Sequence, residues 1–242
     1  MVKHLVNIMD IHFLNTTKSN FLRKYLMPHL VNEEKCFVVT ANPEIVMKTR
    51  EDHSYKSAVK SAHYIIPDGI GILWAAKYKK TPLQERIPGI ELMVDLLEYA
   101  HTKGLRCYFL GAQQSVNEKV IQEIKIKYPH LIIAGHHHGF FELDDEEIVE
   151  HVVQSAPDIV FVALGLPRQE KWIAQHINRF TKGLFIGVGG SFDVIAGEVE
   201  RAPETWIKLN LEWLYRIIKQ PSRVLRIFKV FEFIGRVILR RD

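Results

Sequence analysis

The stretch CFVVTANPE, residues 36–44, joins a short apolar run to a polar turn and a helix-start signal. A short run that is nearly all apolar, such as residues 36–40, is typical of a strand that is covered on both faces of a parallel sheet. Asn42 followed by Pro43 is typical of a helix N-terminus, because Asn can cap the helix and Pro fits its first turn. The stretch therefore predicts one unit of strand, turn and helix.

Similar units follow one another along the chain to about residue 195. Alternation of apolar strands with helical segments predicts an α/β domain whose mainly parallel sheet is flanked by helices, which is a Rossmann-like architecture. The expected strands are residues 4–9, 36–40, 63–66, 106–110, 131–135, 159–164 and 184–188.

After residue 197 the pattern changes to two helical stretches, residues 203–219 and 221–241. Residues 205–242 contain 9 Lys or Arg against 3 Asp or Glu, whereas the rest of the chain contains 23 basic and 25 acidic residues. We therefore expect an α/β catalytic domain over residues 1–197 and a basic helical appendage over residues 198–242.

The second helical stretch is amphipathic at about 100° per residue. Its polar side carries Arg226, Lys229, Glu232, Arg236 and Arg240. Such a helix is typical of docking on an anionic membrane surface, and packing against the α/β body is the alternative that remains open. The apolar side carries Val224, Ile227, Phe228, Phe231, Ile234, Ile238 and Leu239.

The composition excludes several classes of protein. Of 242 residues, 47% are hydrophobic and 25% are charged, which is typical of a soluble globular protein rather than a disordered or fibrous one. The longest stretch without Asp, Glu, Lys or Arg, residues 128–141, is too short to span a bilayer, and Asp10 argues against a signal peptide. We therefore expect a cytoplasmic protein in which Cys36 and Cys107 are reduced core residues.

The loops that follow the expected strands are polar and rich in glycine. Ligands of an open parallel sheet bind at the carboxyl ends of its strands, so these loops would line a single cleft. They are residues 40–44, 67–71, 111–112, 165–171 and 187–193.

Asp68 is the most informative carboxylate of these loops, because Pro67 and two glycines hold it in a turn between a buried strand and a helix. A carboxylate in this place can act as a general base. Asp is also common as a helix cap, here of the helix that starts near Ile70. The residue pattern alone leaves both roles open.

The segment GVGGSFD, residues 187–193, contains Gly187, Gly189 and Gly190. Glycines let a backbone approach a phosphate, and a following helix start supplies amide protons, which suits a diphosphate. Because the spacing G-x-G-x-x-G is missing, a dinucleotide site is not favoured, and a plain tight turn is an equal alternative. Gly111, which follows another strand, is a further candidate for contact with substrate.

A metal centre is not expected. His136 and His138 would point the same way from a strand end, but no third ligand with suitable spacing accompanies them. The sequence also contains no Asp-x-Asp motif that could hold a divalent ion against a nucleotide diphosphate. Arginines and backbone amides would then stabilise the charge of the departing phosphate. The candidates are Arg86 and the appendage residues Arg216, Arg223 and Arg226, for which a solvated helix surface is the alternative.

Eight motifs occur in one order between about residue 7 and residue 226: TANPE, PDGIG, ERIPG, HHHG, ALGLPRQEKW, GVGGSFDVIAG, RAP and EWLYR. In this combination the sequence resembles the WecG/TagA/CpsF family of bacterial glycosyltransferases, and within that family the TagA branch. The resemblance implies transfer of N-acetylmannosamine from UDP-ManNAc to the 4-hydroxyl of undecaprenyl-diphosphate-linked GlcNAc, in the synthesis of wall teichoic acid linkage units.

The same resemblance implies roles for individual residues. Asp68 would be the base of an inverting transfer, and Thr40, Asn42, Arg86 and Gln169 fall on active-site positions. Asp193 falls on the nucleotide-binding loop, and Arg216, Arg223 and Arg226 fall on appendage positions that face the lipid diphosphate.

Other functions remain as alternatives. A member of the same family could use UDP-ManNAcA or another UDP-sugar, because ManNAc and its uronic acid differ by one carboxylate. A nucleotide-sugar oxidoreductase or epimerase is disfavoured by the missing G-x-G-x-x-G motif, and a non-catalytic module recruited to the membrane is a third hypothesis. The expected partners are a UDP-sugar, a polyprenyl-diphosphate-linked acceptor and the inner face of the cell membrane. A homo-oligomer is left open, and neither a nucleic acid partner nor a cofactor is expected.

Overall fold

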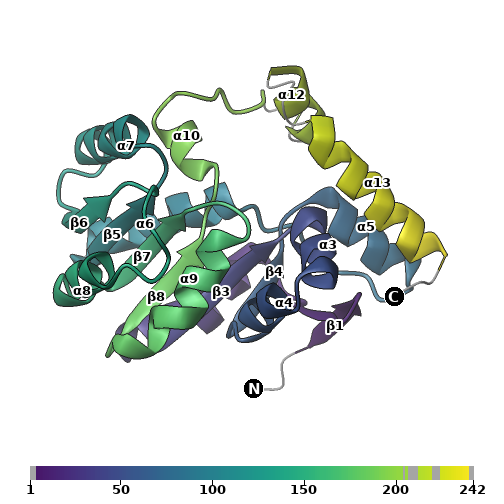
Figure 1. Ribbon diagram of the computed structural model, residues 1–242, viewed down its shortest axis with the longest axis horizontal. Coiled ribbons are helices and arrows are strands. Elements are labelled where there is room, and N and C mark those ends of the chain that lie inside the picture. Colours follow the sequence, from purple (N-terminus) through teal and green to yellow (C-terminus); the bar gives the residue numbers. More distant parts are fainter. Residues whose placement is uncertain (1–3, 204, 207–211, 220–223, 240–242) are drawn as a thin grey trace.

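The computed structural model describes residues 4–203, 205–206, 212–219 and 224–239 of the chain. At its centre lies a six-stranded parallel sheet with the strand order β4-β3-β8-β7-β5-β6 (Figure 1). The predicted α/β architecture is therefore confirmed. The strands of this sheet are β3 (Lys35–Ala41), β4 (Tyr64–Pro67), β5 (Arg106–Gly111), β6 (Ile132–His137), β7 (Ile159–Ala163) and β8 (Gly183–Gly187).

Helices connect the strands and cover both faces of the sheet (Figure 1). The helix predicted after residue 42 begins as expected, because Asn42 Oδ1 accepts a hydrogen bond from Ile45 N at 3.0 Å and Pro43 is the first helical residue. Up to residue 203 the helical elements are α1 (Lys18–Asn20), the π-helix η1 (Phe21–Leu26), α2 (Met27–Val31), α3 (Pro43–Glu51), α4 (His53–Lys60), α5 (Ile70–Tyr78), α6 (Gly89–Lys103), α7 (Gln114–Lys127), α8 (Glu146–Gln154), α9 (Arg168–His176), the 3-10 helix η2 (Ile177–Arg179) and α10 (Ser191–Ile195).

Side chains of β3 alternate between two apolar clusters, one on each face of the sheet. Phe37 and Val39 lie in the first cluster together with residues of α3, α4 and α9, whereas Cys36 and Val38 lie in the second together with residues of α6 and α7. Successive side chains of a strand point to opposite faces, so an apolar run is needed where both faces are covered. Cys36 and Cys107 are buried and form no disulfide, as predicted.

The first predicted strand is not part of the main sheet. It is β1 (Leu5–Ile8), which pairs in antiparallel register with β2 (Ile11–Leu14), a strand that the sequence analysis did not predict. Met9 and Asp10 form the two-residue turn, and both have positive φ angles, 49° and 69°. Hairpin turns of this kind favour Asn and Gly, so a Met-Asp pair gave no signal for a hairpin.

The C-terminal helices are α12 (Glu212–Lys219) and α13 (Val224–Ile238), which lie within the two predicted helical stretches. Helix α13 packs against α3 and α5, with Phe233 and Val237 buried in the first apolar cluster (Figure 1). These two residues are not on the predicted apolar side, so α13 has one packed apolar face and a second one that is largely exposed. The exposed residues of the second face are Phe228, Phe231, Ile238 and Leu239.

Candidate active site

The predicted glycine-rich loops meet at one edge of the sheet. All six strands are parallel, so their carboxyl ends lie together, and the strand order places the end of β3 between the ends of β4 and β8. The loops at residues 40–44, 67–71 and 187–193 are therefore neighbours. The loops after β7 and β5 follow along the same edge.

Thr40 and Asp68 approach each other at the first residue of α6. Gly89 N donates a hydrogen bond to Asp68 Oδ2 at 3.2 Å. A Cβ atom on Gly89 would lie 3.2 Å from Thr40 Oγ1 and 3.6 Å from Asp68 Oδ2. Both side chains are thus directed to the same helix start, where a glycine leaves room for them.

Asp68 is not the N-cap residue of α5, the helix that follows it. The N-cap position of α5 is occupied by Gly69, with φ +128°. The Asp68 carboxylate instead accepts from the N-terminus of α6, a helix that is distant in sequence. The partial positive charge of a helix N-terminus stabilises a carboxylate in this position.

Asn42 and Arg86 border the turn that carries Asp68. A Cβ atom on Gly69 would lie 3.6 Å from Asn42 Cβ, so the caps of α3 and α5 are in contact. Arg86 is half-buried and precedes Ile87, whose N–H donates to Pro67 O at 2.8 Å. The structure therefore brings Thr40, Asn42, Asp68 and the backbone of Arg86 to one end of β3 and β4.

The loop after β8 is held from two sides. Thr40 Oγ1 donates to Gly187 O at 3.1 Å, and Gly189 N donates to Gln169 Oε1 at 3.2 Å. A Cβ atom on Gly187 would lie 2.6 Å from Gln169 Nε2, and Gly189 has a positive φ of 46°. The Gln169 amide is thus packed directly beneath the glycine-rich loop, and its role in the active site stays a prediction.

A buried carboxyl group lies next to Gln169. Glu170 Oε1 accepts from Gln169 Nε2 at 2.6 Å, and Glu170 Oε2 accepts from the hydroxyl of Tyr55 on α4 at 3.0 Å. Burial raises the pKa of Glu170 to about 7, although the hydrogen bonds oppose this shift. Burial and the neighbouring Glu170 also raise the pKa of Tyr55.

Neither Tyr55 nor Glu170 was among the residues predicted from the sequence. Glu170 belongs to the charged run RQEK, residues 168–171, which is typical of an exposed helix start. The available signal was helical spacing, because Glu170 lies three residues before Ile173 and so shares its buried face.

Gly111 lies against the backbone of β7, and Asp193 bonds to residues that follow α10. Gly111 has a φ of +126°, and a Cβ atom on it would lie 2.4 Å from Ala163 O. The close approach of β5 to β7 therefore requires this glycine. Asp193 is half-buried in α10, and its carbonyl oxygen accepts from Glu198 N and Val199 N. Contact of Gly111 or Asp193 with a substrate remains a prediction.

His136, near the carboxyl end of β6, has a structural partner. His136 Nδ1 lies 2.8 Å from Asn117 Oδ1, and Asn117 Nδ2 donates to the carbonyl oxygens of Phe109, Gly111 and His137. Burial lowers the pKa of His136. Within the described part of the chain, no group of three or more His, Cys, Asp or Glu is arranged to hold a metal ion.

The chain matches the family described as glycosyl transferase WecG/TagA/CpsF over residues 6–242. It belongs to this family. Two similar proteins are named N-acetylglucosaminyldiphosphoundecaprenol N-acetyl-beta-D-mannosaminyltransferase. The protein from Staphylococcus aureus (strain MRSA252) is 38% identical over 234 residues, which cover 96% of this chain and 91% of the relative. The protein from Bacillus spizizenii (strain ATCC 23059 / NRRL B-14472 / W23) is 36% identical over 231 residues, which cover 96% and 90%.

Membership of the WecG/TagA/CpsF family makes this protein a glycosyltransferase, as the sequence resemblance implied. The alternatives of a nucleotide-sugar oxidoreductase and of a non-catalytic module are set aside on this ground. None of the helices in the described ranges is long and apolar enough to cross a bilayer.

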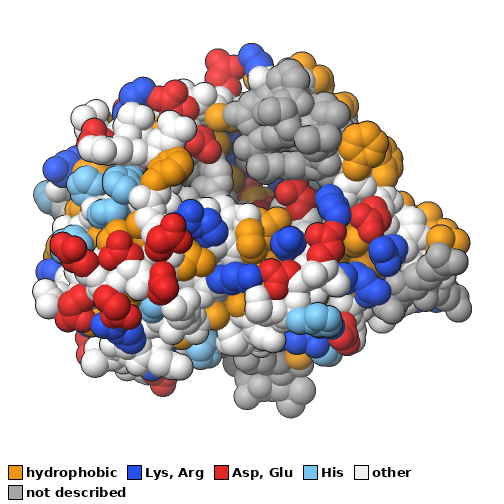
Figure 2. Space-filling model, viewed as in Figure 1, with side chains coloured by type: hydrophobic (Ala, Val, Ile, Leu, Met, Phe, Trp, Pro, Cys, Tyr) orange, Lys and Arg blue, Asp and Glu red, His pale blue; other side chains and the backbone are white. Residues whose placement is uncertain are grey.

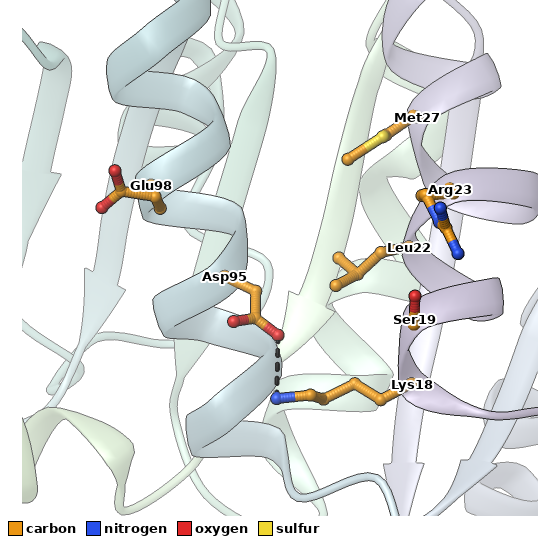
Figure 3. A pocket seen from close by; sticks show the side chains of 7 residues that line it. All are labelled: Lys18, Ser19, Leu22, Arg23, Met27, Asp95 and Glu98. Carbon is orange, nitrogen blue, oxygen red and sulfur yellow. Dashed lines mark ion pairs between the residues drawn. The ribbon is translucent and has the colours of Figure 1, made fainter.

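An open groove of about 310 Å³ lies between η1 and α6. Figure 3 shows Lys18 and Asp95 directed toward each other across it, and their ion pair spans 3.0 Å. Lys18 also pairs with Glu91 at 3.3 Å, so the groove walls are held together by charge. The groove is lined by Lys18, Ser19, Leu22, Arg23, Met27, Asp95 and Glu98.

The arginines of the appendage cannot be placed against the site. Arg223 lies outside the described residues, and the side chains of Arg216 and Arg226 lie outside the description as well. Their contact with a lipid diphosphate therefore stays a prediction.

Two basic side chains of α13 are paired with carboxylates. Lys229 forms ion pairs with Glu51 of α3 and with Glu232, and Arg236 pairs with Glu232 at 2.9 Å. These pairs neutralise part of the basic side, whereas the second apolar face stays uncovered. Figure 2 shows hydrophobic side chains along the outer side of α13, at the upper right of the view.

Proposed function

We propose that this glycosyltransferase moves N-acetylmannosamine from UDP-ManNAc to undecaprenyl-diphosphate-linked GlcNAc, in the synthesis of a wall teichoic acid linkage unit or a related surface polysaccharide. The names of both relatives support this, because they give that acceptor and a β-mannosaminyl product. Residues 1–197 would carry the chemistry, and residues 198–242 would form the appendage that meets the lipid-linked acceptor.

The observation that carries this proposal is the position of Asp68 between Thr40 and the start of α6, at the carboxyl edge of the sheet. Asp68 takes the proton of the acceptor hydroxyl, and the hydroxyl oxygen forms a bond to C1 of the sugar. The bond between C1 and the diphosphate oxygen breaks at the same time, and UDP leaves with the electron pair. Attack from the face opposite UDP inverts the anomeric centre, so a single base is sufficient.

Cationic and amide groups stabilise the charge that develops on the departing diphosphate. Arg86 lies next to the turn that carries Asp68, and the glycine-rich loop at residues 187–190 lies nearby, where Thr40 bonds to Gly187 O. Thr40 and Asn42 stand beside Asp68 and would orient the sugar. Because the sequence has no Asp-x-Asp motif, we propose that the transfer is independent of metal ions.

We further propose that the exposed apolar face of α13 rests on the cytoplasmic side of the membrane. Phe228 is 66% exposed and Phe231 is 63% exposed, and Trp213 and Ile218 of α12 are exposed as well. A helix with such a face is typical of proteins that lie on a bilayer, and several large apolar side chains in water need a partner. The polyprenyl chain of the acceptor would hold the second substrate in the same bilayer.

A transfer assay tests the donor and acceptor directly. The protein is incubated with a GlcNAc-diphospho-lipid analogue and, in separate reactions, UDP-ManNAc, UDP-ManNAcA and UDP-GlcNAc, and the products are identified by mass spectrometry. We expect a disaccharide from UDP-ManNAc, with a β linkage by NMR. A product from UDP-ManNAcA alone would show that the donor has been assigned wrongly.

Replacement of the proposed base tests the mechanism. Asp68→Asn should lower kcat by at least ~100-fold, because general-base catalysis typically contributes 10²–10⁴-fold. The affinity for UDP, measured by calorimetry, should stay close to that of the wild type. Asp144→Asn removes an exposed carboxylate outside the site and is the matched control. An Asp68→Asn enzyme that keeps more than about a tenth of wild-type kcat contradicts the assignment.

A further inference from the structure

Three buried polar side chains form a continuous chain of hydrogen bonds beneath the glycine-rich loop. Tyr55 is 0% exposed, Glu170 is 1% exposed and Gln169 is 5% exposed. The chain runs from the Tyr55 hydroxyl to Glu170, from Glu170 to the Gln169 amide, and from that amide to Gly189 N. This chain of hydrogen bonds links a buried side chain of α4 to the backbone of a loop at the sheet edge.

The direction of these bonds is fixed by Glu170. When Glu170 is ionised it only accepts hydrogen bonds, so the group that faces its Oε1 atom must be the NH₂ end of the Gln169 amide. The carbonyl end of the amide is then turned toward Gly189, where it meets a backbone N–H that only donates. Without an acceptor at Glu170, the amide could turn over and place its NH₂ group against that N–H.

The amide has little freedom to compensate by moving. Gly187 passes so close to it that a Cβ atom on this residue would lie 2.6 Å from Gln169 Nε2 and 3.2 Å from Glu170 Oε1. On its other side, Gly187 is held through its carbonyl oxygen by Thr40. A change in the orientation of Gln169 therefore changes the backbone of residues 187–190.

We propose that Glu170 is a positioning residue for the nucleotide donor. It fixes the Gln169 amide so that the loop at residues 187–190 presents its backbone to the diphosphate, and Tyr55 holds Glu170 in place. This inference rests on the proposed role of that loop in binding a UDP-sugar. It assigns Glu170 and Tyr55 a task in the reaction although neither touches the substrate.

Packing of the helices does not account for this carboxyl group. A second link between α4 and α9, the ion pair of Lys171 Nζ with Asp52 Oδ2 at 2.8 Å, lies one residue away at the surface. Burial of a carboxyl group costs stability, and an apolar residue of similar volume would pack as well or better. The two-sided hydrogen bonding of Glu170 is explained by the orientation that it imposes on Gln169.

Hydrogen exchange tests the positioning on the free protein. In Glu170→Gln one acceptor oxygen replaces two, and we expect the Gly189 amide to exchange at least ~10-fold faster, because loss of a modest hydrogen bond is worth about that factor. Lys171→Gln, which breaks the neighbouring ion pair between the same two helices, should leave this amide unchanged. Equal exchange in wild type and Glu170→Gln, or equal acceleration in both variants, overturns the proposal.

Binding and kinetics test the consequence for the donor. Glu170→Gln should raise the Kd for UDP and the KM for the UDP-sugar about tenfold, with kcat and the acceptor KM changed much less. An equal fall of kcat at unchanged donor KM overturns the positioning role. If Glu170→Gln does not fold, Tyr55→Phe takes its place, and unchanged Gly189 exchange in that variant overturns the proposal. A wild-type protein that transfers no sugar refutes the proposed function, whereas Gly189 exchange still decides the positioning.

Discussion

The buried carboxyl group of Glu170 makes the stability of the protein depend on pH in a way that one substitution removes. Burial raises the pKa of Glu170 from the ordinary 4.5 to about 7 in the folded protein. Between these two values the unfolded chain releases this proton and the folded protein keeps it. Unfolding then releases a proton, so the contribution of Glu170 to the free energy of unfolding falls as the pH rises.

The size of this effect follows from the two pKa values. A tenfold difference in acid dissociation corresponds to about 1.4 kcal/mol, so the contribution of Glu170 should fall by about 3 kcal/mol in total, most of it between about pH 5 and pH 8. Glu170→Gln has no ionisable group at this position. The free energy of unfolding of the wild type minus that of the variant should therefore decrease by this amount over the same interval.

Urea denaturation followed by circular dichroism at several pH values measures this difference. The other titrating groups are common to both proteins and cancel. Of the groups next to Glu170, Tyr55 has a raised pKa and stays neutral over the interval, and the hydrogen bond from Lys171 lowers the pKa of Asp52, so that Asp52 stays ionised. A difference that is constant from about pH 5 to pH 8 would refute the raised pKa.

Three further outcomes are expected. Gly187→Ala should weaken UDP binding at least ~10-fold, because the new Cβ meets the Gln169 amide and overpacking typically costs 1–3 kcal/mol. Calorimetry measures the affinity. The control is Gly235→Ala, since a Cβ at Gly235 has open space. Equal affinities in the two variants would contradict the steric argument. Phe233→Ala should lower the free energy of unfolding by about 3–5 kcal/mol, because Phe233 is buried. Phe231 is exposed, so Phe231→Ala should change this free energy by less than about 0.5 kcal/mol. Phe231→Ala should instead weaken binding to anionic vesicles in a flotation assay. The reverse pattern would mean that the two faces of α13 have been confused. Turnover should persist in EDTA, and loss of turnover that Mg²⁺ or Mn²⁺ restores would contradict metal independence.

The sheet could be predicted from the sequence because its strands are short apolar runs followed by polar turns. Residues 36–39 are apolar since both faces of β3 are covered, and the same reason holds for β7 and β8. The β1–β2 hairpin could not be predicted, because Met9 and Asp10 adopt positive φ angles without the residues that usually signal such a turn. Its conformation depends on packing rather than on local preference.

The candidate site was predictable only where a residue lies in a loop at a strand end. Asp68 directly follows β4, and Thr40 lies near the carboxyl end of β3, so both stand where ligands of a parallel sheet bind. The bond from Gly89 to Asp68, however, joins residues far apart in sequence. Glu170 was missed because α4, which is distant in sequence, buries its side chain and supplies the hydroxyl that bonds to it. Its neighbours in sequence give no sign of this burial. In α13, Phe233 and Val237 were assigned no packing role, because the sequence does not show which of two apolar faces meets the body.

The two apolar faces of α13 would set the distance between the catalytic residues and the surface of a bilayer. Phe233 and Val237 fasten the helix to the body, while Phe228 and Phe231 on the other face point outward. With the outer face at the lipid surface, α13 acts as a spacer, and the distance from the lipid headgroups to Asp68 is set by the body rather than by a flexible tether. Acceptors would then be selected by the reach of their head group, and a saccharide lengthened by further sugars would carry its reactive hydroxyl past the base.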